Sequence, residues 1–239
     1  MRNFIFQLRS LFTYFSAILF FFIVGTILII VSFFNRGDVF EFLIKKFSKT
    51  LLFIAGIKTE IEGVEKIDPK KQYIVMMNHV NIFDAFLFYS SFPGKARGVE
   101  EESHFSWPFY GWVMSRVGMI PINRKSGRKA LESLKKAGQL IRERSEFSIA
   151  VLPEGTRTLN GKLSKFKKGG FLLAIESGLD ILPVIQLGSF AIKRKGRKLI
   201  KPGRVKLIFE LPISVKGYSR KNINELMNEV RMIFGKYLE

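Results

Sequence analysis

The stretch Tyr73-Ile-Val-Met-Met-Asn-His-Val-Asn-Ile-Phe-Asp84 is the centre around which the rest of the sequence is organised. Its apolar residues 73–77 are typical of a strand that is buried on both faces. The polar residues 78–81 predict a turn at the end of that strand, and residues 83–88 predict a helix after it. Sites in open α/β sheets form at the carboxyl ends of strands. We therefore expect a functional site at His79, one of two histidines in the chain.

Alternating strand and helix patterns surround this stretch. Strand patterns cover residues 57–61, 147–152, 181–187 and 205–211, and helical patterns cover residues 108–117, 127–143, 170–177 and the segment from Asn222 onward. Such alternation predicts an α/β fold with a mixed, largely parallel sheet flanked by helices. Pro108 is expected in the first turn of its helix. Pro183 restricts its strand to an edge, an end or a bulge. Asn222 and Glu225 predict a capping box.

The N-terminal segment has a different composition. Residues 11–34 are almost wholly apolar and carry no charge, and as a helix they would extend roughly 36 Å, enough to cross a bilayer. Residues 35–38 interrupt the apolar run. Residues 39–55 then have the pattern of a basic amphipathic helix, with Glu41, Lys45 and Lys49 on its polar face. Such a helix lies on a membrane surface or packs on a protein core. We expect a two-helix membrane anchor over residues 1–56 and an α/β domain over residues 57–239.

Two arrangements of this anchor are open, a full span and a hairpin lodged in one leaflet. Basic residues flank the apolar segment on both sides, namely Arg2, Arg9, Arg36, Lys45, Lys46 and Lys49. A single span prefers most of its Lys and Arg on one side of the membrane. The sequence therefore favours the hairpin, with both ends on the cytoplasmic face of the cell membrane.

The net charge of +19 and the absence of Cys limit the possible functions. The charge predicts an anionic partner, which includes nucleic acid, anionic phospholipid, a phosphorylated substrate and an acidic carrier protein. A highly charged, thermostable surface is the alternative. Without Cys there is no disulfide or thiolate nucleophile. Two histidines and no Cys also supply no ligand cluster, so we expect no metal.

His79 and Asp84 have the residue types of a general-base pair. A base keeps one imidazole nitrogen free for the proton, while a carboxylate holds the other nitrogen and fixes the tautomer. Five residues along a regular helix separate two side chains by about 140°. The pair can therefore form only if His79 precedes the helix that carries Asp84. A capping or surface histidine is the alternative interpretation.

Two further stretches carry residues suited to a phosphate. The strand at residues 147–152 ends in Pro153-Glu-Gly-Thr-Arg157, where Gly155 permits close backbone approach and Thr156 and Arg157 can donate to phosphate oxygens. The apolar residues 118–123 lead to Arg124, which could meet the same phosphate. A Pro-Gly turn with a solvent-facing arginine is the alternative for the first of these stretches.

These blocks, in this order, resemble the glycerolipid acyltransferase family, and most of all its 1-acyl-sn-glycerol-3-phosphate acyltransferases. The blocks are Asn78-His-x4-Asp84, the segment ending in Arg124, Pro153-Glu-Gly-Thr-Arg157 and the apolar strand around Pro183. The resemblance covers about residues 61–187. It implies transfer of a fatty acyl group from acyl-CoA or an acyl carrier protein to the sn-2 hydroxyl of lysophosphatidic acid, making phosphatidic acid, without a cofactor.

The resemblance also implies roles for individual residues. His79 would be the general base, and Asp84 would hold its ring. Arg124 and Arg157 would hold the acceptor's phosphate, and Glu154, Gly155 and Thr156 would contribute to acceptor binding. A cluster of basic residues near the C-terminal part of the domain has three possible roles: contact with acidic lipid, docking of the phosphates of CoA or of a carrier protein, or no role beyond a solvated loop. The cluster consists of Lys193, Arg194, Lys195, Arg197, Lys198, Lys201, Arg204 and Lys206.

One stretch departs from the family pattern. A lysine is common there ahead of the Pro-Phe-x-Gly that corresponds to residues 108–111, but this chain has Glu100-Glu-Glu102. We expect another cation to bind the phosphate, with Lys168 and its neighbours Lys165 and Lys167 as candidates. His104, in the same stretch, is expected to have no catalytic role.

Three other functions compete with this interpretation. A thioesterase would use the same pair to activate water. A related acyltransferase would use another acceptor, glycerol 3-phosphate or an amino-acid lipid. A membrane-tethered nucleic-acid binder would explain the charge but leaves the four blocks without a role, so we expect no nucleic acid partner.

Overall fold

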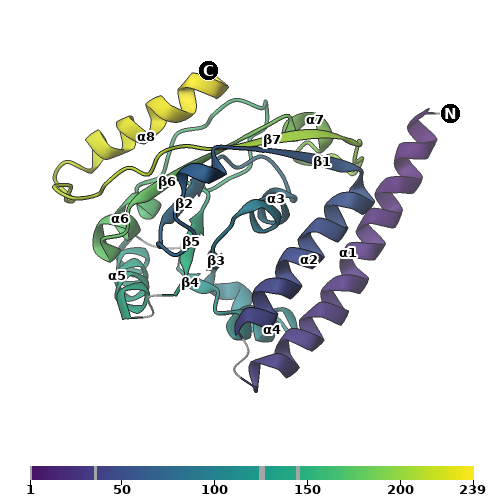
Figure 1. Cartoon of the computed structure of the whole chain (residues 1–239), viewed down its shortest axis with the longest axis horizontal. Coiled ribbons are helices and arrows are strands. Elements are labelled where there is room, and N and C mark those ends of the chain that lie inside the picture. The colour runs from purple at the N-terminus through teal and green to yellow at the C-terminus, as the bar shows by residue number, and fades with distance from the viewer. Residues whose placement is uncertain (1, 35–36, 124–126, 144–145) are drawn as a thin grey trace.

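A seven-stranded mixed sheet forms the centre of the domain (Figure 1). The computed structural model describes residues 2–34, 37–123, 127–143 and 146–239. The strands are β1 (Ile57–Glu62), β2 (Ile74–Met77), β3 (Ala96–Glu101), β4 (Ile120–Ile122), β5 (Ser148–Val151), β6 (Ile181–Leu187) and β7 (Gly203–Phe209). Their order is β1-β7-β6-β2-β5-β3-β4, and every pairing is parallel except β6 with β7. The predicted fold class is confirmed, although strands β3 and β4 were not anticipated.

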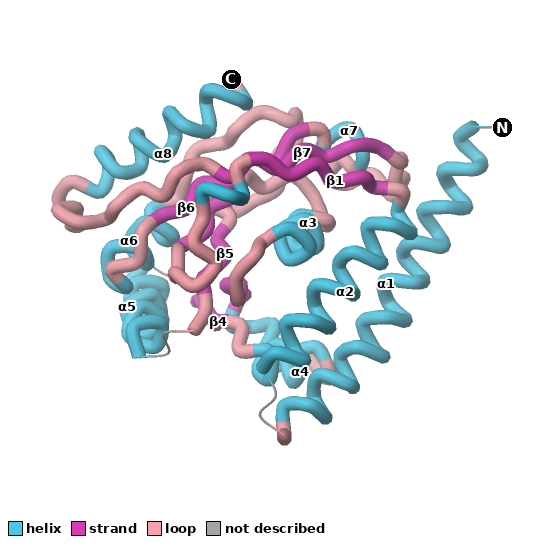
Figure 2. The backbone as a smooth tube through the Cα atoms, viewed as in Figure 1, coloured by secondary structure: helices cyan, strands magenta, loops and turns pink. Residues whose placement is uncertain are grey.

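Helices cover both faces of the sheet (Figure 2). They are α1 (Arg2–Ser32), α2 (Gly37–Ala55), α3 (Asp84–Ser91), α4 (Tyr110–Val117), α5 (Gly127–Glu143), α6 (Lys168–Ser177), α7 (Ser189–Ile192) and α8 (Ile223–Leu238), with 3₁₀ turns η1 (Val64–Lys66) and η2 (Glu102–Ser106). One core joins the sheet to α5, α6 and α8, and a second joins it to α2 and α3. These two layers enclose the sheet, and α1 lies outside α2.

Strand β2 occupies the middle of the sheet, as its apolar run predicted. All four of its side chains are buried. Ile74 and Met76 belong to the core under α5 and α6, whereas Val75 and Met77 belong to the core under α2 and α3. Because both faces of the strand are covered, its sequence is apolar throughout rather than alternating. The strand ends at Met77, two residues before His79.

Pro183 lies in an inner strand, and a bulge makes this possible. Strand β6 pairs with β7 from Val184 onward, and Ile181 forms a separate bridge with Ile213. Between these two contacts, residues 210–212 lie opposite only Leu182 and Pro183. The register therefore shifts by one residue, as at a bulge, and the carbonyl of Pro183 accepts the N–H of Glu210 at 3.0 Å although Pro has no N–H to donate. Of the three predicted placements, the bulge is the one found.

One predicted helix start and one predicted helix cap were wrong. Helix α4 begins at Tyr110, after Phe109 takes a positive φ of 61°, so Pro108 precedes the helix rather than lying in its first turn. The predicted capping box of α8 does not form. The Asn222 side-chain oxygen instead accepts hydrogen bonds from the backbone N–H and the hydroxyl of Ser219. A local turn therefore competes with the cap for the same side chain.

Helix α1 is longer than predicted and exposes an apolar surface. Residues Phe4–Ser32 are long and apolar enough to cross a membrane by length and composition alone, and most of this segment is not buried. Helix α2, by contrast, lies between α1 and α3. Its Phe40, Leu51 and Leu52 are buried within the protein, so packing on protein explains its amphipathic pattern. The long apolar helix indicates membrane association.

A buried ion pair joins α2 to the sheet. Glu41 of α2 accepts a hydrogen bond from the guanidinium of Arg97 in β3, and both residues are buried. The guanidinium lies over the rings of Phe40 and Phe147, 4.4 and 4.0 Å from their centroids. The sequence placed Glu41 on the polar face of an amphipathic helix, but it is buried there because Arg97 of β3 pairs with it. The pair fixes the N-terminal helices against the sheet.

Replacing Glu41 by Ala tests this contact. The change would leave a buried guanidinium without its carboxylate, which costs about 3–5 kcal/mol in comparable proteins. In a chain of this length we expect Tm to fall by roughly 6–20 °C, measured by circular dichroism in detergent. Glu62→Ala is the matched control, because Glu62 pairs with Lys206 at an exposed position where a pair contributes about 0–1 kcal/mol. Equal Tm values for the two variants would contradict the prediction.

Candidate active site

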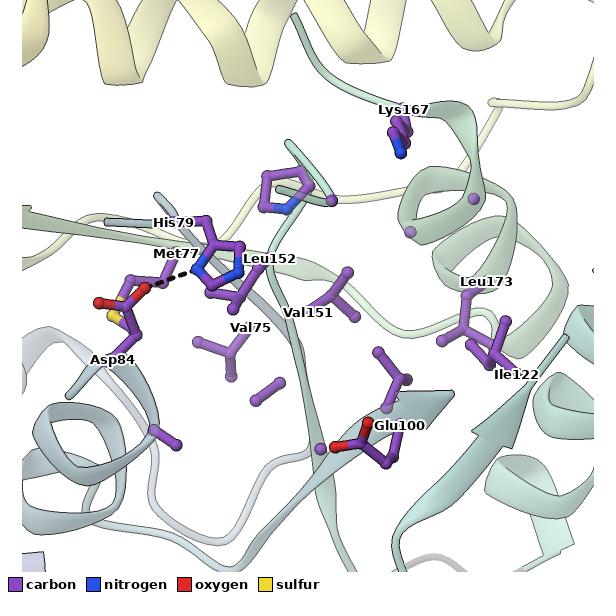
Figure 3. A pocket seen from close by; sticks show the side chains of 18 of the residues that line it. Val75, Met77, His79, Asp84, Glu100, Ile122, Val151, Leu152, Lys167 and Leu173 are labelled. Atoms are coloured by element: carbon purple, nitrogen blue, oxygen red, sulfur yellow. Dashed lines mark hydrogen bonds and ion pairs between the residues drawn. The ribbon is translucent and has the colours of Figure 1, made fainter. Parts of the chain in front are cut away.

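His79 and Asp84 form a hydrogen-bonded pair at the carboxyl end of β2. The ring Nδ1 of His79 lies 2.7 Å from Asp84 Oδ2. The Asp84 side chain is 3% exposed and that of His79 is 21% exposed, so the imidazole is reachable while the carboxylate is enclosed. Nε2 makes no hydrogen bond to the described residues, and Figure 3 shows this edge of the ring turned away from Asp84. A free nitrogen opposite a held one is the arrangement that a general base requires.

The turn between β2 and α3 makes this geometry possible. Asp84 is the first residue of α3, so His79 lies outside the helix, as the spacing argument required. Asp84 Oδ2 also accepts the backbone N–H of Val80 at 2.8 Å, and Oδ1 accepts that of Asn81 at 3.0 Å. These bonds stabilise a carboxylate that is removed from water. One side chain therefore shapes the turn and holds the imidazole.

Two buried asparagines attach this turn to strand β6 and the segment after it. Asn78 exchanges side-chain and backbone hydrogen bonds with Gln186, at distances of 2.6 to 3.1 Å. The Asn81 amide donates to the backbone oxygen and the hydroxyl of Ser189, at 2.9 and 2.8 Å. Neither Gln186 nor Ser189 was singled out from the sequence, because their partners are more than a hundred residues away. Both ends of the turn are thus fixed by tertiary contacts.

Glu154 is hydrogen-bonded to the backbone of His79. Its carboxylate is buried, and Oε1 accepts the backbone N–H of His79 at 2.7 Å. Oε2 accepts the backbone N–H of Ser164 at 2.8 Å. Thr158 N–H also donates to the His79 carbonyl at 2.9 Å. The block at residues 153–157 is therefore joined directly to the block at His79, and the position of Glu154 suits it to holding the histidine backbone.

A pocket of about 420 Å³ opens beside the imidazole (Figure 3). His79, Asp84 and Gly155 contribute to its wall. The rest of the lining is mainly apolar and comes from four strands and three helices, including Val75, Met77, Phe88, Val99, Ile122, Leu134, Val151, Leu152 and Leu173. The pocket adjoins the place where β3 leaves β5, since their pairing ends at Gly98 and Ala150. Such a space suits a linear apolar group whose polar end lies at His79.

Glu100 brings a carboxylate to the wall of this pocket. Its Oε1 lies 2.6 Å from Nδ1 of His104, and its Oε2 accepts the Tyr110 hydroxyl at 3.2 Å. Burial, and then the neighbouring Glu100, raise the pKa of the Tyr110 phenol. The stretch in which the family resemblance led us to look for a lysine thus supplies a carboxylate with its own partners. The site's cations must come from elsewhere.

Cations gather around the end of the Pro153–Arg157 block. Lys195 Nζ donates to the Thr156 hydroxyl at 3.0 Å. Lys193 is buried, and its ammonium donates to the carbonyls of Arg194 and Arg197. Burial, and then the nearby Arg157 guanidinium, lower the pKa of Lys193. The guanidinium of Arg157 has no carboxylate partner among the described residues. This group of like charges is suited to an anion.

The other predicted binding residues fall into different places. Thr156, Arg157 and Lys168 do not line the pocket, whereas Lys167 does. Lys168 is exposed at the first position of α6, so of the candidate lysines Lys167 is the one at the pocket. Arg124 lies outside the described residues. Within the described ranges, no three His, Asp or Glu side chains come together as metal ligands.

Some site residues could have been found from the sequence and others could not. Lys193 and Lys195 belong to a basic stretch that the sequence left open as lipid-binding, carrier-binding or solvated. The structure brings this stretch to Thr156 and Arg157. The run of basic residues was the signal in the sequence for an anion-binding segment. Only the position of this segment after β6 in the structure shows that it lies at Thr156 and Arg157.

Comparisons with known proteins agree with this geometry. Residues 58–186 match the sequence model of the Acyltransferase family. A 1-acyl-sn-glycerol-3-phosphate acyltransferase of Limnanthes douglasii is 31% identical over 188 residues, which are 79% of this chain and 65% of the relative. The protein of that name from Pseudomonas aeruginosa is 29% identical over 174 residues, 72% of this chain and 66% of the relative. One from Borreliella burgdorferi is 37% identical over 136 residues, 57% and 54% of the two chains.

A solved structure extends the similarity to the whole fold. The crystal structure of the 1-acyl-sn-glycerophosphate (LPA) acyltransferase PlsC from Thermotoga maritima superposes with a TM-score of 0.83 at 25% identity. The alignment covers 100% of this chain and 97% of that one. The chain spans between about half and two thirds of the length of the curated relatives that it matches. The family match includes the two blocks that meet at His79, and on this evidence the chain belongs to the Acyltransferase family.

Proposed function

We propose that the protein transfers a fatty acyl group from an acyl thioester, acyl-CoA or acyl carrier protein, to the sn-2 hydroxyl of 1-acyl-glycerol 3-phosphate. The product is phosphatidic acid. The observation that carries the proposal is the His79–Asp84 pair, which lies in the wall of an apolar pocket and is joined through Thr158 to a block beside the cations Lys193 and Lys195. The printed names of the relatives support the same reaction.

In this proposal His79 acts as a general base and then as an acid. Nε2 takes the proton of the acceptor hydroxyl as its oxygen attacks the thioester carbonyl. The tetrahedral intermediate collapses with cleavage of the carbon–sulfur bond, and the proton passes from the imidazolium to the departing thiolate. Asp84 orients the ring and stabilises its positive charge while the proton is held. The transfer is direct and needs no acyl-enzyme or cofactor.

The two sides of the site would divide the substrates between them. An acyl chain in the apolar pocket would place its carbonyl beside His79. Arg157, Lys193 and Lys195 would bind the acceptor's phosphate, because charge-assisted bonds to phosphate oxygens are about twice as strong as neutral ones. Thr158, next to Arg157, is hydrogen-bonded to the His79 carbonyl, so the phosphate site would be coupled in position to the base. Fixing both reactants in this way lowers the entropic part of the barrier.

We further propose that α1 lies in one leaflet on the cytoplasmic face, as the hairpin arrangement requires. The helix is attached to the domain along its length. Ser10 accepts the backbone N–H of Ile200 at 2.8 Å, and the Tyr14 hydroxyl donates to the Lys198 carbonyl at 2.9 Å. Further along, the ring of Phe22 lies 4.9 Å from that of Phe109 of the α4 N-terminus. A full span would carry these attached polar segments into the hydrocarbon, at a cost of several kcal/mol for each unsatisfied backbone group.

His79→Ala tests the base. Loss of a general base typically lowers the rate by about 10²–10⁴-fold, and we expect such a fall in kcat with the acceptor and labelled acyl thioester. His104→Ala is the matched control and should retain most of the activity. Products are separated by thin-layer chromatography. Near-wild-type transfer by His79→Ala would overturn the mechanism, and acceptor-independent release of free fatty acid by the wild type would indicate a thioesterase instead.

Glu154→Gln separates positioning from acceptor binding. The amide keeps the shape of the carboxylate but can accept only at one end, so one backbone N–H, of His79 or of Ser164, loses its partner. We expect kcat to fall about tenfold, which corresponds to a lost hydrogen bond of about 1.4 kcal/mol, with little change in KM for the acceptor. A raised KM with unchanged kcat would place Glu154 in acceptor binding.

Arg157→Ala and Lys195→Ala test the phosphate site. Hydrogen bonds to charged groups contribute about 1.5–3 kcal/mol, so each variant should raise the KM for the phosphorylated acceptor by roughly 10–150-fold. Arg157→Lys should recover part of the loss. Lys201→Ala, a change at an exposed lysine of the same basic stretch, is the control and should behave as wild type. An unchanged KM for Arg157→Ala would exclude that residue from the phosphate site.

A further inference from the structure

The chain's only two tryptophans lie exposed on neighbouring elements outside the active site. Trp107 follows η2 and is 52% exposed, and Trp112 in α4 is 68% exposed. Large aromatic side chains are normally well buried, because they carry 150–250 Å² of surface each. Two of them on one exposed segment require an explanation, and the proposed reaction gives them no role.

This segment adjoins the exposed apolar surface of α1. Figure 1 shows α4 beside the end of α1 from which the chain turns toward α2. Phe109 contacts Phe22, which is 51% exposed. Arg116 lies one turn beyond Trp112 on the same side of α4, and its guanidinium lies 4.7 Å from the ring centroid of Phe33, which is 68% exposed. The tryptophan surface and the apolar surface of α1 are therefore continuous.

The tryptophan side chains are held in position rather than loosely attached. The ring of Trp107 lies 4.2 Å from that of His104 and 5.8 Å from that of Tyr110. Both neighbours are hydrogen-bonded to Glu100 in the pocket wall. Trp112 stands on a helix whose other side packs into a small core with α1 through Val113 and Val117. The surface thus has a fixed orientation relative to the pocket.

We propose that the η2–α4 surface around Trp107 and Trp112 is a second membrane contact, made by the catalytic domain itself at the lipid headgroup level. Trp is enriched at this level because its ring is apolar and its indole N–H can bind water or headgroups. Arg116 at the same surface suits anionic lipid. Together with α1, this contact sets the tilt of the domain, and with it the direction in which the pocket faces the bilayer. The inference does not rest on the proposed reaction.

A bilayer fits this surface better than a protein partner does, because the surface is continuous with the exposed apolar side of α1. The neighbouring surface on α1 is apolar over a helix long enough for a membrane, with Phe15, Ile18, Phe22, Ile23, Ile27 and Ile30 all exposed. An exposed patch of this extent marks either a membrane or a protein contact. Net charge +19 favours the anionic surface of a cytoplasmic leaflet. A surface that begins in the membrane and continues onto α4 without interruption meets the same lipid.

Tryptophan fluorescence tests the proposal directly, because both native fluorophores lie in this surface. The full-length protein is reconstituted into vesicles of phosphatidylcholine and phosphatidylglycerol that contain lipids brominated close to the glycerol end of the acyl chains. Trp107→Phe and Trp112→Phe each leave one fluorophore. We expect the lipid bromines to remove most of the fluorescence of each single-tryptophan protein, and added iodide to quench it little.

Two control variants calibrate the quenching by brominated lipid and by iodide. Both are made in the tryptophan-free variant that carries Trp107→Phe and Trp112→Phe. Ile23→Trp places the fluorophore on the exposed face of α1 and should be quenched strongly. Met232→Trp places it at a 66% exposed position of α8, which lies on the opposite side of the molecule from α1 in Figure 1, and should respond to iodide instead. Far-UV circular dichroism in detergent confirms that each variant is folded.

The outcomes separate the possible occupants. Quenching of Trp107 and Trp112 by brominated lipid at the level of Ile23→Trp supports the membrane contact. Quenching at the level of Met232→Trp overturns it. Fluorescence that brominated lipid does not quench but that changes when acyl carrier protein is added would assign the surface to a protein partner. Fluorescence that changes instead with the ratio of protein to lipid would assign it to a second copy of the chain. Either result would overturn the proposal.

Discussion

The carboxylate of Asp84 is the constraint on which the site depends. It is enclosed, and a buried charge is tolerated only when hydrogen bonds replace the lost water. Its two oxygens meet this requirement with the N–H groups of Val80 and Asn81 and with the His79 ring. The chain can satisfy all three only by turning sharply between β2 and α3. The same bonds that stabilise the charge therefore orient the imidazole.

Distant segments hold that turn from outside. Glu154 binds the His79 backbone from the end of β5, and Gln186 binds Asn78 from the end of β6. Both bonds arise because β2 has β5 and β6 as its parallel neighbours, so that three carboxyl ends meet at one edge of the sheet. Residues of the block at 153–157 thus serve two purposes. Glu154 holds the backbone of His79, while Arg157 lies near Lys193 at a place suited to phosphate.

Attachment to a membrane gives the arrangement of helices a purpose. The apolar surface of α1 is exposed, yet its other side is fixed to α2, α4 and the segment before β7. The buried Glu41–Arg97 pair continues this attachment to the edge of the sheet. In the proposed reaction the acceptor resides in the bilayer, so this rigid coupling would let the position of the membrane determine where the acceptor meets His79.

The sequence by itself determined the features that depend on local pattern. Continuous apolar runs identified β2, β5 and β6, a 3.6-residue period identified α5, and the residue types at His79, Asp84 and Arg157 indicated the chemistry. Only the tertiary structure decided which surfaces are covered and which distant groups meet. Glu41 has the pattern of a polar-face residue but is buried, since it pairs with Arg97 of β3. Lys193 belongs to a basic run but is buried near Arg157. The pattern of polar and apolar side chains tells which face of a helix or strand is polar. Which other segment packs against that face depends on the order of the strands in the sheet.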